Sequence, residues 1–204
     1  MSGRRRGSAG TSAWPKIASL ARRSAASVAS IRSGCRPVST AAICKAAGVS
    51  PGNLFHYFPT KAATIDAVAQ EDQREMADRF ARHADADNAL TAIEEIALAW
   101  MESSSDPVYA RISVETAAEA TRNPDVAALF AVNEAQVKGR LVALIKRGVA
   151  QGEIDGSLKP DLVATWLLAL AEGAAGRVVF EPGFKPRAHR AMLRTIIQRK
   201  LKPQ

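Results

Sequence analysis

One stretch of 23 residues, from Ser39 to Lys61, constrains this chain more than any other part of it. Its first half is rich in small apolar residues and ends at Gly48, a residue that commonly closes a helix in the left-handed conformation. Ser50 can cap a second helix, and Pro51 stands at the first helical position, where proline is tolerated. The stretch therefore predicts two short helices joined by a tight turn, a unit whose second helix suits the major groove of DNA.

The second predicted helix divides into an inward and an outward side. Leu54 and Phe58 lie four residues apart and share one face, so they are expected in the core. A helical hairpin that only packs against its neighbours is the alternative interpretation, but it leaves Phe55, His56 and Tyr57 exposed together without a use.

At these residues the chain resembles the TetR family of bacterial transcriptional regulators. The usual family run, Ile-Ala-x-x-Ala-Gly-Val-Ser-x-Gly-x-Leu-Tyr-x-His-Phe-x-x-Lys, is matched without a gap from Ile43 to Lys61. The resemblance implies an all-α protein with an N-terminal three-helix head of the helix-turn-helix type. It also implies a C-terminal helical bundle for ligand binding and dimerisation.

The resemblance also assigns DNA contacts to residues of this stretch. It implies phosphate contacts for Ser39, Thr40, Ser50, Asn53, Tyr57 and Lys61, and positions at or near bases for Pro51, Gly52, Asn53, Phe55 and His56. The chemistry agrees, because hydroxyls, amides at helix starts and a lysine bind phosphate. Asn53 is the expected base reader, since its amide can pair with adenine through two bonds. Phe55 replaces the commoner tyrosine, so a phenol hydrogen bond is lost there.

Charge is distributed unevenly along the chain. The net charge is +8, yet residues 1–65 hold ten Lys and Arg side chains and no Asp or Glu. The 18 other basic and all 20 acidic side chains follow residue 65. This asymmetry predicts a polyanion, double-stranded DNA, as the partner of the N-terminal third. A solvated tail is the alternative for Arg4–Arg6.

Composition excludes several other classes of protein. Aromatic residues make up 5% of a chain that is 47% hydrophobic, which favours helices packed through small side chains. The two cysteines cannot form a disulfide framework, and the three histidines lie in separate segments, so neither metal nor cofactor is expected. No nucleophile, base and orienting group come together in the sequence, and an enzyme is not expected. No apolar run is expected to reach membrane-spanning length.

The chain divides into segments as follows. Residues 1–12 are expected to be a disordered basic arm, residues 13–60 the helix-turn-helix domain, and residues 85–204 the effector-binding and dimerisation domain. A helix over 61–84 links the two domains, with Met76 and Phe80 inward and acids such as Glu71 outward. Caps and first-turn prolines predict further helices near 87–103, 106–121, 124–151, 161–179 and 187–200.

The segment before the motif departs from the family pattern. Counting back from Gly34, only Ala25 and Ala26 agree with the residues that the family's first helix turns inward. Three explanations stay open: a helix packed in a shifted register, a loose core, or a stretch translated in the wrong frame.

Two further sites are predicted in the second half of the chain. The larger side chains of an alanine-rich bundle suggest an effector pocket, with Trp100, Met101, Tyr109, Phe130 and Trp166 as candidates and ordinary core packing as the alternative. The apolar run over 161–179, with the helix after it, resembles the pair through which relatives dimerise. Trp166, Leu167 and Leu170 are the candidate interface residues.

The sequence thus predicts a cytoplasmic, nucleoid-associated regulator. It would be a dimeric repressor that binds a near-palindromic operator and is released by an unknown small molecule. The alternative is a helical sensor or interaction protein whose DNA-binding head has degenerated.

Overall fold

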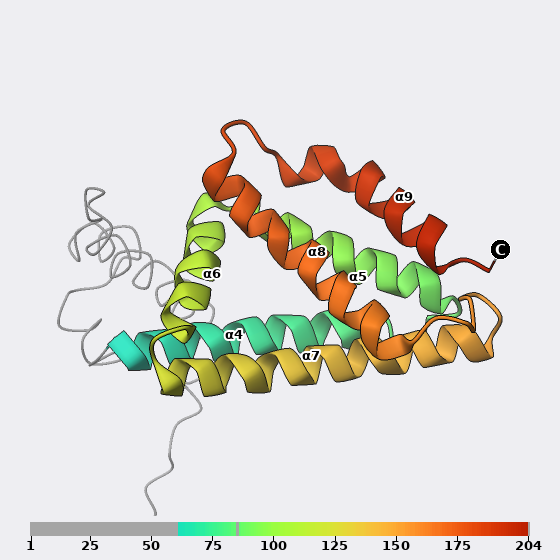
Figure 1. Ribbon diagram of the computed structural model, residues 1–204, viewed down its shortest axis with the longest axis horizontal. Coiled ribbons are helices and arrows are strands. Elements are labelled where there is room, and N and C mark those ends of the chain that lie inside the picture. Colours follow the sequence, from blue (N-terminus) through green and yellow to red (C-terminus); the bar gives the residue numbers. More distant parts are fainter. Residues whose placement is uncertain (1–60, 85, 204) are drawn as a thin grey trace, which may run out of the picture. The chain divides into compact units, whose positions relative to one another are not determined.

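The computed structural model describes residues 61–84 and 86–203, where all regular structure is helical (Figure 1). The DNA-contact candidates from Ser39 to Tyr57 lie outside the described residues. The elements in chain order are α4 (Lys61–Arg82), α5 (Ala89–Ser103), α6 (Pro107–Ala120), α7 (Pro124–Ala150), α8 (Pro160–Phe180), the 3₁₀ turn η1 (Pro186–His189) and α9 (Arg190–Leu201).

The helices begin where capping residues and prolines predict. The side chain of Asn88 accepts a 2.7 Å bond from the amide of Thr91 at the start of α5. Asn123 caps α7 in the same way, and a proline occupies the first turn of both α7 and α8. The main difference lies at the C-terminus, where the predicted helix over 187–200 opens as the 3₁₀ turn η1 before α9 continues.

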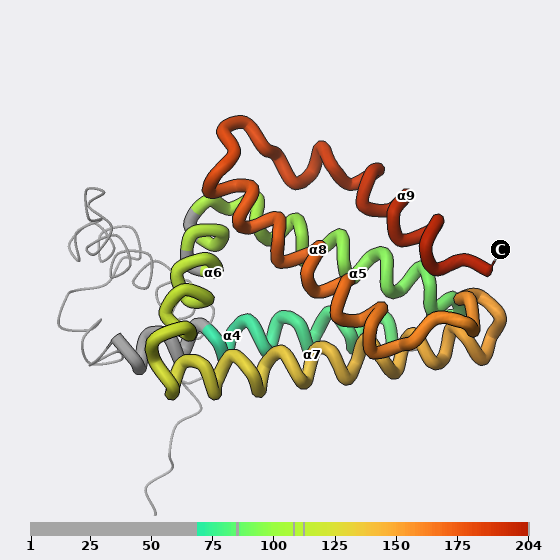
Figure 2. The backbone as a smooth tube through the Cα atoms, viewed as in Figure 1, coloured from blue at the N-terminus to red at the C-terminus, as the bar shows by residue number. Residues whose placement is uncertain are grey.

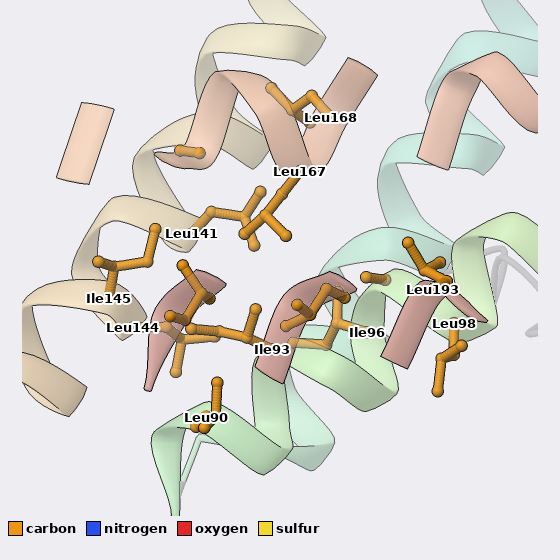
Figure 3. Packing of buried hydrophobic residues seen from close by; sticks show 14 of the residues in the cluster. Leu90, Ile93, Ile96, Leu98, Leu141, Leu144, Ile145, Leu167, Leu168 and Leu193 are labelled. Atoms are coloured by element: carbon orange, nitrogen blue, oxygen red, sulfur yellow. The ribbon is translucent and has the colours of Figure 1, made fainter. Parts of the chain in front are cut away.

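The chain divides into two compact units between Val68 and Ala69, inside α4. The second unit, residues 69–204, is a helical bundle in which α8 packs against α5, α6 and α7, while α9 packs against α5 (Figure 2). Its core joins leucines and isoleucines of α5, α7, α8 and α9 (Figure 3). Met76 and Phe80 of α4 belong to the same cluster, as predicted.

A series of ion pairs fastens η1 and α9 to α5. The Arg194 guanidinium lies 3.3 Å from a carboxylate oxygen of Glu94 and also 3.3 Å from one of Glu95. Further along, Glu102 pairs with Arg187 and with Arg190. Glu94 is buried, so this attachment couples an ion pair to the apolar packing of the C-terminal helix.

Glu71 corrects one expectation for α4. The sequence placed it on the outer side, yet the residue is only 4% exposed. Arg74, one turn later, donates bonds of 2.6 and 3.0 Å to its two carboxylate oxygens. A paired carboxylate can be buried where an isolated one cannot, and amphipathic spacing does not reveal that pairing.

Candidate functional site

The described part of the DNA-contact set is Lys61, the first residue of α4. From Lys61, α4 continues without a break into the second unit, so the last residue of the predicted motif and part of the bundle share one helix.

The predicted pocket residues occupy different environments. Met101 of α5 is buried, and Trp100 is half-buried and packs against the core. Tyr109 of α6 and Phe130 of α7 are half-buried. Trp166 differs, because it is 70% exposed on α8. Its place in the predicted pocket is thus not supported, since a pocket residue must face the inside of the bundle.

Glu172 of α8 is a polar group that the sequence analysis overlooked. Desolvation, aided by the nearby charge of Glu134 on α7, raises the pKa of its carboxyl to about 7. Glu172 is the one charged residue between Leu162 and Gly176. A single carboxyl within an apolar run is the sequence feature that could have singled it out as a group with a shifted pKa.

The raised pKa of Glu172 predicts a pH-dependent stability. Folding favours the protonated form, so this contribution to the free energy of unfolding is complete below about pH 4.5 and is lost as the pH rises through about 7. Solvent reaches much of the residue, so we expect a smaller effect than for a fully buried carboxyl. Urea unfolding between pH 5 and 8 should show a fall in stability that Glu172→Gln flattens. Equal pH slopes for the two proteins would contradict this assignment, and Glu134→Gln should give an intermediate slope.

Exposed large apolar side chains gather on α8 and α9. We call this set the outer face; its members are Leu162, Trp166, Leu170, Phe180, Met192 and Ile196. The four α8 members recur at spacings of four, four and ten residues, which places them on one side of the helix. Gly173 lies between them, and a Cβ atom built there meets no atom within 4 Å, so this side of α8 is open.

Leu167 does not belong to the outer face. It is 6% exposed and packs in the protomer core, where Figure 3 shows it beside Leu141 of α7. The prediction that Leu167 lines a subunit interface is therefore corrected, whereas Trp166 and Leu170 are accessible. The sequence missed the distinction because α8 is apolar on nearly every side, so its spacing does not mark an inner face.

α8 also meets the length and composition criteria for a membrane-spanning helix. Its most apolar 18 residues have a mean hydropathy of 1.5, which corrects the expectation that no apolar run reaches such a length. Core helices of soluble proteins meet the same criteria. Here one side of α8 packs against α5, α6 and α7.

The described residues contain no cluster of side chains suited to binding a metal ion. Between residues 61 and 203, residue 85 apart, no group of three or more His, Cys, Asp and Glu side chains could hold a metal ion.

Known proteins resemble both halves of the chain. Residues 89–202 match the family model described as BetI-type transcriptional repressor, C-terminal, and residues 23–68 match that of the bacterial regulatory proteins of the tetR family. The second match includes part of the segment before the motif that departs from the family pattern.

Individual relatives agree with these matches. The HTH-type transcriptional regulator UidR of Escherichia coli (strain K12) is 28% identical over 149 residues, which cover 72% of this chain and 74% of UidR. Salmonella enterica GusR is 26% identical, with a TM-score of 0.67 over 97% of this chain and 99% of GusR. A Saccharomonospora viridis regulator solved with choline shares the fold, with a TM-score of 0.70 at 20% identity, over 94% of this chain and 98% of its own.

These relatives are regulators of transcription, a class without enzymatic chemistry of its own. The helical bundle and the matched segments lead to one conclusion: the chain belongs to the TetR family of bacterial regulatory proteins and is a ligand-responsive, DNA-binding regulator of transcription.

Proposed function

We propose that the protein is a homodimeric repressor that binds a near-palindromic operator and leaves it when a small molecule binds the bundle. The observation that carries this proposal is the outer face of α8 and α9, six large apolar side chains exposed in the protomer. Exposed apolar surface of this kind usually marks an interface. A second copy is the occupant we propose, because a two-fold axis lets the same patch cover itself.

The dimer gives the operator its form. Two heads related by a two-fold axis would bind half-sites about 34–36 Å apart on successive major grooves, so the site should be close to a palindrome. We assign the head to residues 13–60, the connection to the helix from 61 to about 84, and effector binding and dimerisation to residues 85–204. Because its DNA target is the bacterial chromosome, we propose a cytoplasmic location, on the nucleoid when bound.

Within each head, we propose the division of labour that the motif implies. Asn53 reads a base, with Pro51, Gly52, Phe55 and His56 close to the bases. The remaining polar groups hold phosphates; they are Ser39, Thr40, Ser50, Tyr57 and Lys61.

The effector would act by shifting a population of conformations. We propose that it binds between α5, α6, α7 and α8, where Trp100, Met101, Tyr109 and Phe130 are inside or half inside the bundle. A ligand that prefers the conformation with wrongly spaced heads lowers operator affinity by its differential affinity for the two states, commonly about 1–3 kcal/mol. Choline is the ligand of the Saccharomonospora viridis protein, with which this chain, at 20% identity, shares the fold alone.

Footprinting on DNA around the protein's own gene tests the proposal. A repressor should protect one discrete, near-palindromic site at moderate salt, and its affinity should fall steeply as salt rises. Equal binding to every duplex, with no protected site, would reject the repressor and favour a helical sensor or interaction protein with a degenerate DNA-binding head.

Two substitutions in the head should have different consequences. Asn53→Ala should cost about 1–3 kcal/mol and relax specificity at one base pair in each half-site, because it removes a base contact. Lys61→Ala should weaken binding to all sequences similarly, because a phosphate contact carries no sequence information. Competition titrations with single-base operator variants distinguish them. A uniform loss across those variants for Asn53→Ala would show that Asn53 positions the protein without reading a base.

A further inference from the structure

The carboxyl end of α7 and the turn after it contact both sides of the joint between α4 and α5. We define the α4–α5 joint as residues 83–90. On one side, the Arg147 guanidinium donates to the main-chain oxygens of His83 (3.5 Å), Ala84 and Ala86 (3.3 Å). On the other side, the Glu153 carboxylate accepts bonds from the amides of Ala89 (2.6 Å) and Leu90 (3.2 Å).

The two charges meet different parts of the joint. The carbonyl groups that Arg147 binds lie just after Arg82, the last residue of α4, so Arg147 fixes the chain where it leaves that helix. The first amides of α5 form a positive end, which a carboxylate stabilises. Arg147, in the last turn of α7, and Glu153, in the turn after it, thus hold the segment that follows α4 and the start of α5.

Toward its amino end, α4 is joined to α7 by bonds between neutral groups. Gln73 and Gln136 share a 3.0 Å bond, and the Asn133 amide reaches the carbonyl oxygen of Ala69 at 3.4 Å. In each of these bonds, as in those of Arg147, the two partners are separated by 61 to 64 positions in the chain. The near-constant separation shows that α4 and α7 run parallel (Figure 1). Charged bonds therefore hold the segment just after α4, and Met76 and Phe80 anchor the carboxyl half of the helix in the core.

We infer that Arg147 and Glu153 fix the pivot of α4 and are positioning residues for the spacing of the operator-binding heads. The inference rests on the proposed function and adds to it the residues that set the position of α4. From Lys61 to the joint, α4 is 22 residues long, or about 33 Å at helical rise. A tilt of about 6° at the pivot moves the amino end by roughly 3.4 Å, about one base-pair step. Small errors at this joint therefore become errors of register on DNA.

Operators with altered half-site separation test this role without knowledge of the effector. The operator is used in its native form and with one base pair inserted or deleted at its centre. Wild-type protein should prefer the native spacing. Arg147→Met should reduce that preference by about tenfold while retaining affinity for nonspecific DNA, because each head is intact but its position is less well defined. Arg147→Lys keeps the charge without the planar fork, so it should restore the preference in part.

Lys146→Met is the matched control. It removes the same charge from the neighbouring, exposed position of α7 and should keep the wild-type spacing preference. A purely structural defect would lower the active fraction equally on all operators and leave the preference unchanged, and that result would overturn the inference. If Arg147→Met does not fold by circular dichroism, Glu153→Gln provides the same measurement from the other side of the joint, and an unchanged preference would again overturn it.

Hydrogen exchange separates this inference from the proposed function. Arg147→Met should speed exchange of amides in residues 83–90 in the free protein, whatever the DNA result, and unchanged exchange there would overturn the clamp itself. A wild-type protein without any preferred operator would instead reject the repressor, and with it the role of the joint in head spacing.

Discussion

Trp166→Arg should convert the protein from a dimer into a folded monomer that has lost most of its operator affinity. Trp166 is 70% exposed in the protomer, so an arginine there leaves the fold of the single chain intact. In the proposed dimer the same position is covered by a second copy, where two unpaired charges would be desolvated at high cost. A monomer has one head, and losing the second should reduce affinity on the order of 10²–10³.

Sedimentation velocity, circular dichroism and operator titration measure this result together. Val132→Arg is the matched control, because Val132 is an exposed apolar residue of α7, outside the outer face. It should remain a dimer with wild-type affinity. A folded Trp166→Arg dimer that binds its operator normally would show that the subunits pair through another surface.

Leu167→Arg, one residue further along α8, should instead prevent folding. Leu167 is 6% exposed and packs against core leucines and isoleucines. Burying an unpaired guanidinium costs several kcal/mol, at least about 3–5, and domains of this size have only about 5–15 kcal/mol of stability. The variant should be insoluble, or should lack a cooperative thermal transition by circular dichroism.

Leu170→Arg is the control for this second prediction. Leu170 is 39% exposed on the outer face, so an arginine there should affect pairing and leave the protomer folded. A soluble Leu167→Arg protein with a cooperative transition close to that of the wild type would contradict the placement of Leu167 in the core.

The contrast between Trp166 and Leu167 shows what the sequence could not provide. Helix ends were predictable, because caps such as Asn88 and Asn123 and first-turn prolines act through neighbouring backbone. The inner side of α8 was not, since a helix that is apolar nearly all round has no face marked by its sequence. Burial there depends on which helices lie alongside, and this is known only once the bundle is formed.

Polar contacts between distant segments were equally beyond prediction. Arg147 reads from sequence as one more basic residue near the end of a helix, yet its partners lie 61–64 residues earlier in the chain. Glu71 was placed outward because acids usually are, and the pairing that buries it appears only in the structure. The family is the opposite case, because a dense local motif identified it, and the match over residues 23–68 agrees. The DNA-contact residues within the motif stay predictions.

The attachment of α9 to α5 has a consequence for how the dimer is made. The bond between Arg194 and Glu95 joins residues 99 positions apart, and the amide of Asp155 donates to the carbonyl oxygen of Leu201 near the chain end. Contacts so distant in sequence close late, because the intervening chain must first be ordered. α9 follows in the chain every helix that it packs against, so its part of the outer face can dock only after α5 has been made. Subunits should therefore pair through the complete face only after α9 has docked on α5 within each protomer.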